Sequence, residues 1–153
     1  MAGPPILEAS HGRRLFTEDD ANALVPVLES AFRRIDPKLA RLPEVQDLFE
    51  DREAYWGRGL LRAPLSERDA HAEALRQLDG ARASVDEEVR GLEALGVEVK
   101  DVRMGLADFR ARRDGDIVYL CWQRGEPKVA HWHTLEGGFA GRRPLEPRTR
   151  AEP

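Results

Sequence analysis

Two stretches of the chain place apolar residues at the three- and four-residue spacing of an amphipathic helix. The first follows Thr17, which can cap a helix, with Asp20 at the third helical position as its partner in a capping box. This helix is predicted over about residues 17–42, with a kink at Pro26 and a break or kink at Pro37. Its apolar stripe consists of Ala21, Leu24, Leu28, Phe32, Ile35, Leu39 and Leu42.

A second helix is predicted over about residues 66–95, opened by Ser66 and closed by Gly96 as a C-cap. Residues 43–64 have a looser pattern with two glycines near the end, which predicts a connection. Two helices joined in this way are expected to pack antiparallel, or against a second copy, because exposing their apolar stripes to water is unfavourable. The second stripe consists of Leu75, Leu78, Val85, Val89, Leu92 and Leu95.

From Val97 the apolar period changes from 3.6 to 2, which is typical of strands. Four short runs, VEVKDV, LADFRAR, DIVYLCW and KVAHWHT, predict an antiparallel meander of three to four strands within about residues 97–135. The predicted fold class is therefore α+β, with two long amphipathic antiparallel helices followed by a small β-meander in a single domain over residues 16–145. Residues 1–15 and 146–153 lack periodicity and are predicted to be disordered tails.

The dipeptide Asp114-Gly115 is the strongest hairpin signal in the chain, and a two-residue turn there places Arg113 opposite Asp116. Counting outward places Asp108 opposite Cys121 on a mixed face of the sheet. The other face is apolar and holds Ala107, Phe109, Ala111, Val118, Leu120 and Trp122.

The next hairpin has two possible registers, because its turn can hold an odd or an even number of residues. If Cys121 lies opposite Val129, then Trp132 joins the apolar face and packs in the core. His131 and His133 then share the mixed face with Asp108 and point away from the core. If the turn were one residue longer or shorter, both histidines would move to the apolar face. The first register is favoured, because it keeps the polar imidazoles off the face that is buried.

Alternate residues on a strand point to the same side, so His131 and His133 are candidates for binding one metal ion. Asp108 and Glu136 could each supply a carboxylate, and Cys121 a third ligand or a nucleophile with a histidine as its base. Two histidines with a carboxylate suit zinc, or iron and manganese with positions left open. The sequence thus predicts one divalent-metal site on the polar face of the sheet. The alternatives are two solvent-facing histidines and a cysteine that only packs.

Composition narrows the function classes further. The 24 basic and 28 acidic residues nearly cancel and are interspersed, so no nucleic-acid partner is implied. The sequence contains no run of membrane-spanning length and nothing typical of a secretory signal, which predicts a cytoplasmic protein. The single cysteine excludes an internal disulfide and fits a reducing compartment. No nucleotide or flavin motif is found, and the pattern identifies neither an enzymatic reaction nor a small-molecule substrate.

Several strings of this chain resemble the signature strings of a bacterial domain-of-unknown-function family, the one numbered 2203. They are FTEDDANALVP (16–26), GVEVKD (96–101), GLADF (105–109), VYLCW (118–122), GEP (125–127), WH (132–133) and GFAGR (138–142). The resemblance covers nearly the whole predicted domain, and it implies no activity and no catalytic residues.

The resemblance does distinguish the two histidines. The family's last-strand string is similar to Tyr-Trp-His followed by an acidic residue, so His133 matches it, whereas His131 stands where an aromatic residue is more typical. In this chain the acidic residue comes later, at Glu136. The resemblance therefore favours His133 as the ligand, together with Asp108, Cys121, Glu98 or Asp101.

Two hypotheses of different classes follow. The first is a small cytoplasmic protein that binds one divalent metal through His133 and a carboxylate, with His131 or Cys121 assisting. The second is a non-enzymatic, homo-oligomeric interaction or assembly module whose helical stripes pair with another chain. Self-association is expected in either case, because a small sheet leaves two edges and a second face to cover.

Overall fold

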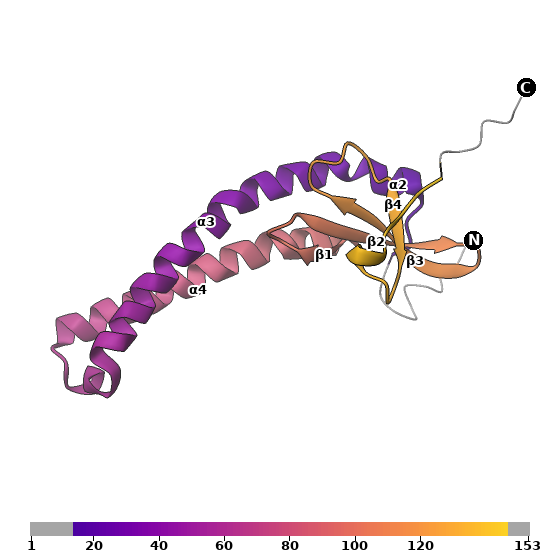
Figure 1. Ribbon diagram of the computed structural model, residues 1–153. Helices are drawn as coiled ribbons and strands as arrows, with labels where there is room; N and C mark the ends of the chain where they lie inside the picture. The colour runs from indigo at the N-terminus through magenta and orange to yellow at the C-terminus, as the bar shows by residue number, and fades with distance from the viewer. Residues whose placement is uncertain (1–13, 147–153) are drawn as a thin grey trace, which may run out of the picture. The chain divides into compact units, whose positions relative to one another are not determined.

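The computed structural model describes residues 14–146, so the predicted tails lie almost entirely outside the described residues. Helices come first and an antiparallel sheet of five strands follows (Figure 1), which confirms the predicted α+β class. The chain divides into two compact units, one formed by residues up to Phe32 and from Gly91 onward, the other by residues 33–90. Among the described helices, none has the length and apolar character needed to cross a membrane.

The first helix begins at the predicted capping box. In α2 (Glu18–Ala23), Thr17 Oγ1 accepts a hydrogen bond from the backbone N of Asp20, and Thr17 N donates to Asp20 Oδ2, both at 3.0 Å. A single residue, Leu24, separates α2 from α3 (Val25–Trp56). Pro26 thus stands at the second position of α3, where a backbone N–H would have no partner within the helix, so the proline removes no hydrogen bond there.

The predicted end of this helix near residue 42 is wrong. Helix α3 continues to Trp56 with Pro37 and Pro43 inside it. Each proline removes one hydrogen bond of the helix, but burial of residues further along, such as Val45, favours continuation. The predicted connection over residues 43–64 is therefore mostly helical, and only the 3-10 turn η1 (Gly57–Arg62) and two further residues link α3 to α4 (Leu65–Ala94).

Within the unit of residues 33–90, α3 and α4 form an antiparallel hairpin. Ion pairs join Lys38 to Glu88 at 3.1 Å and Arg52 to Glu67 at 2.9 Å. Residues that come later in α3 therefore lie beside residues that come earlier in α4. Helix α4 agrees with its predicted bounds to within one residue at each end. Gly96, with a φ of 93°, ends it as predicted, because Val97 N donates to the carbonyl of Leu92 at 3.2 Å.

The sheet has the order β1-β2-β3-β4-β5 and every neighbouring pair is antiparallel. The prediction of three to four strands missed β5, which is two residues long and too short to show an alternating pattern. The strands are β1 (Glu98–Asp101), β2 (Leu106–Arg113), β3 (Asp116–Gln123), β4 (His131–Thr134) and β5 (Arg143–Pro144).

The register of the β2–β3 hairpin agrees with the prediction at every pair, from Arg113 opposite Asp116 to Asp108 opposite Cys121. The register of β3 and β4 differs from the prediction. Cys121 pairs with His131 and not with Val129, a shift of two residues. Because side chains alternate with a period of two, this shift leaves both histidines on the predicted face, beside Cys121.

The apolar face of the sheet carries the core of this unit. Trp122 is 0 % exposed and stacks on Phe32 with ring centroids 6.1 Å apart, while Phe109 meets Phe16 edge to face at 5.1 Å. The prediction that Trp132 packs in this core is wrong. It is only half-buried, because β4 lies next to the short edge strand β5, and its ring contacts the guanidinium of Arg113 at 4.9 Å.

Candidate metal centre

Three chemically different donors meet on the mixed face of the sheet. Asp108 on β2 lies directly opposite Cys121 on β3, and His133 reaches them from β4. One ligand atom from each of the three lies within 4.8 Å of the others, and this is the one such group among residues 14–146. The side chains are 2 %, 0 % and 3 % exposed. The alternative of two solvent-facing histidines is therefore wrong for His133.

The hydrogen bonds of His133 define its protonation. Its Nδ1 lies 2.7 Å from the carbonyl oxygen of Thr134, which can only accept, so Nδ1 carries a hydrogen. Its Nε2 lies 2.9 Å from Asp108 Oδ2, and a hydrogen bond there needs one proton between the two atoms. The pair Asp108 and His133 therefore holds one shared proton. A histidine that donates Nδ1–H to a carbonyl also has the orientation typical of a metal ligand through Nε2.

The carboxyl of Asp108 has an oxygen without a conventional partner. Its Oδ1 is buried and accepts no hydrogen bond from an N–H or O–H group. Burial raises the pKa of this carboxyl, and His133 and the Cys121 thiol, a weak donor, offset part of that rise. Buried carboxylate oxygens normally have partners, so an unpaired one beside a thiol and an imidazole needs an explanation.

Cys121 is not arranged as a nucleophile. Burial, followed by the negative charge of Asp108, raises the pKa of its thiol to about 12. Both ring nitrogens of His133 already have partners, so neither is available to take the thiol proton. Reactive cysteines have lowered pKa values and some exposure, and this residue has neither. The arrangement does not support the predicted alternative of a cysteine nucleophile with a histidine base.

His131 belongs to a second group of side chains on the same face. Its Nδ1 lies 3.4 Å from Glu126 Oε2 and has no hydrogen-bond partner. Glu126 is held by Arg142, whose Nη2 donates to both carboxylate oxygens at 2.7 and 2.9 Å. Sequence reasoning did not find this ion pair. The available signal was that both residues occur in the family-like strings GEP and GFAGR.

Two other acidic residues suggested by the resemblance have different roles. Glu98 lies opposite Asp108, but its carboxylate accepts hydrogen bonds from Tyr119 Oη at 2.9 Å and Lys100 Nζ at 3.1 Å. Asp101 accepts from the backbone N atoms of Arg103 and Met104, both at 2.9 Å, and so stabilises a turn. Neither joins the group formed by Asp108, Cys121 and His133.

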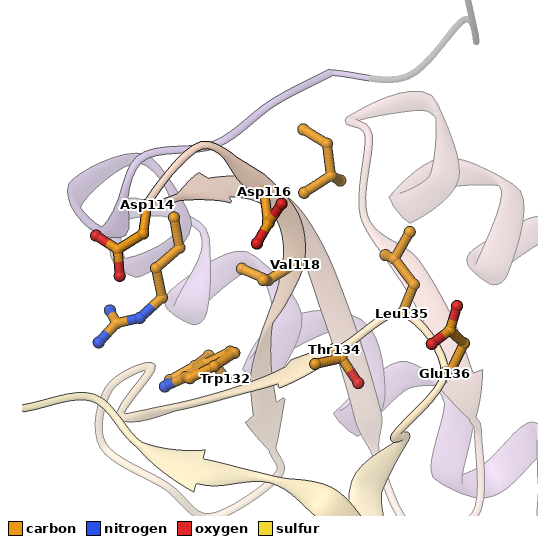
Figure 2. A pocket seen from close by; sticks show the side chains of 9 residues that line it. Asp114, Asp116, Val118, Trp132, Thr134, Leu135 and Glu136 are labelled. Carbon is orange, nitrogen blue, oxygen red and sulfur yellow. The ribbon is translucent and has the colours of Figure 1, made fainter.

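Glu136 lies on the other side of the sheet from His133. It lines a hollow of about 480 Å³ near the tip of the β2–β3 hairpin, together with Asp116, Trp132 and Thr134 (Figure 2). Thr134 and Trp132 flank His133 along β4, so their side chains point to the opposite face. The structure thus brings together Asp108, Cys121 and His133, places His131 beside them, and separates Glu136 from all four.

Comparison with known proteins gives a family and nothing about its chemistry. The family model that matches is described as "Uncharacterized conserved protein (DUF2203)" and covers residues 14–145. No curated protein and no solved structure matches the chain.

Proposed function

Since the chain belongs to the uncharacterized conserved family DUF2203, whose description states no activity, we propose from its own side chains that it binds one divalent transition-metal ion through Asp108, Cys121 and His133. The observation that carries this proposal is the convergence of three buried donors, one of which, Asp108 Oδ1, has no hydrogen-bond partner. A buried polar group without a partner costs about 1–3 kcal/mol, and a bound cation would remove that cost.

The donor types favour zinc over manganese, one of the other ions that the sequence suggested. An imidazole, a carboxylate and a thiolate together suit Zn²⁺, which binds sulfur at about 2.3 Å and nitrogen or oxygen at about 2.0–2.2 Å. Manganese prefers oxygen ligands. A bound ion would take the place of the proton that Asp108 and His133 share.

Metal analysis tests the proposal directly. Protein purified without a His-tag and without chelator is expected to contain about one zinc ion per chain by mass spectrometry of the elements. The variant His133→Ala is expected to lose most of it. His71→Ala is the matched control, because His71 is also a buried imidazole with a carboxylate partner, Glu53 at 2.8 Å, in the other unit. Equal zinc content in His133→Ala and the unmodified chain would rule out the site.

Proton release gives an independent prediction. The Cys121 thiol, with a pKa of about 12, and the hydrogen bond between Asp108 Oδ2 and His133 Nε2 each hold one proton, so zinc binding is expected to release about two protons per ion. Calorimetric titration in buffers of different ionisation enthalpy measures this number. Cys121→Ser is expected to bind zinc more weakly and to release about one proton. Release of no protons by the unmodified chain would mean that zinc binds elsewhere.

A further inference from the structure

Three protein ligands leave one position of a tetrahedral zinc ion open. His131 is the residue best placed to fill it. It pairs directly with Cys121 across β3 and β4, and side chains at such positions have Cβ atoms about 5 Å apart. It also alternates with His133 along β4, so the two imidazoles leave the strand on the same face.

The present contacts of His131 are weak. Its Nδ1 is buried and unpaired, and the 3.4 Å separation from Glu126 Oε2 is long for a hydrogen bond. Glu126 does not depend on this contact, because Arg142 already donates two hydrogen bonds to its carboxylate. The side chain of His131 is 34 % exposed, so it is less tightly packed than Cys121 and His133.

The other donors near the open position are already engaged. The carboxylate of Glu98 is bonded to Tyr119 and Lys100, and the carbonyl of Thr134 accepts from His133. Building on the zinc site proposed above, we infer that His131 turns away from Glu126 and supplies the fourth ligand. Glu126 is then the group that competes with the metal for His131.

A fourth protein ligand changes what the metal does. A closed site with one cysteine, one aspartate and two histidines leaves no position for a reactive water, so the ion acts in structure and not in hydrolysis. Its ligands come from β2, β3 and β4, so it joins the three strands on the face opposite the aromatic core. The His-x-His spacing thereby has a role for both of its histidines.

Zinc affinity distinguishes His131 as a ligand from His131 as a neighbour. The experiment is a competition titration of Zn²⁺ against a chromophoric chelator with the full chain and two variants. His131→Ala is expected to weaken binding by more than the roughly 10–100-fold seen when groups just outside the ligand shell are removed. Glu126→Gln is expected to bind zinc as tightly as the unmodified chain or more tightly, because the competing charge is gone.

Nuclear magnetic resonance of ¹⁵N-labelled histidine supplies a second readout, in which both His131 and His133 are expected to shift on zinc binding. Unchanged affinity of His131→Ala, with His133→Ala devoid of zinc, would overturn the fourth ligand and leave the three-ligand site intact. Equal weakening in His131→Ala and Glu126→Gln would also overturn it, since His131 would then act only through Glu126. If the unmodified chain binds no zinc, both proposals fail.

Discussion

Replacing Asp108 with alanine is expected to lower the free energy of unfolding of the metal-free protein by about 3–5 kcal/mol, the range found when one partner of a buried ionic pair is removed. The loss arises because His133 Nε2, 2.9 Å from Asp108 Oδ2, is left in a buried site without a partner. Urea denaturation followed by circular dichroism in the presence of a chelator measures it.

A double variant compares the loss of one polar partner with the loss of both. In Asp108→Val/His133→Phe both polar groups are replaced by apolar side chains, and such replacements of buried pairs are often neutral or stabilising. The double variant is therefore expected to be more stable than Asp108→Ala, although it cannot bind metal. A double variant that is no more stable than Asp108→Ala would contradict the account given for Asp108→Ala.

Trp122→Ala is expected to cost about 3–5 kcal/mol of unfolding free energy, as large aromatic truncations in cores do. Trp122 is fully buried, stacks on Phe32, and donates from Nε1 to the carbonyl of Glu126 at 2.9 Å. The same urea experiment measures the effect.

Trp132→Ala is the matched control for this prediction, since the same indole is removed from a half-buried position against Arg113 and Arg143. It is expected to cost about 1 kcal/mol, close to the average for measured point substitutions. Equal losses in the two variants would contradict the finding that Trp122 lies inside the core and Trp132 at its margin.

Local signals in the sequence predicted much of the fold. The capping box at Thr17, the glycine that ends α4 and the Asp114-Gly115 turn each act over a few residues, and each was found where expected. The continuation of α3 past Pro37 and Pro43 was not predictable in this way. A proline is unfavourable locally, and only the packing of distant residues decides whether the helix continues.

Strand alternation made it possible to predict which side chains of the site share one face of the sheet. Counting from the Asp114-Gly115 turn placed Asp108 beside Cys121, and the face of His133 was right even though the register of its strand was two residues off. The burial of His133 was not predictable, because it depends on tertiary packing. The pairing of Glu126 with Arg142 joins residues sixteen positions apart across a loop and has no periodic signal.

Because Cys121 is buried, its reaction with an alkylating reagent can be used to detect local opening of the sheet. A thiol that is 0 % exposed, with a pKa of about 12, reacts with an alkylating reagent only from molecules in which the centre of the sheet has opened. Because Cys121 is the single cysteine of the chain, every labelled molecule records an opening event at that one strand. The labelling rate therefore gives the free energy of opening of β3 under native conditions, without denaturant and without a cysteine introduced by mutation.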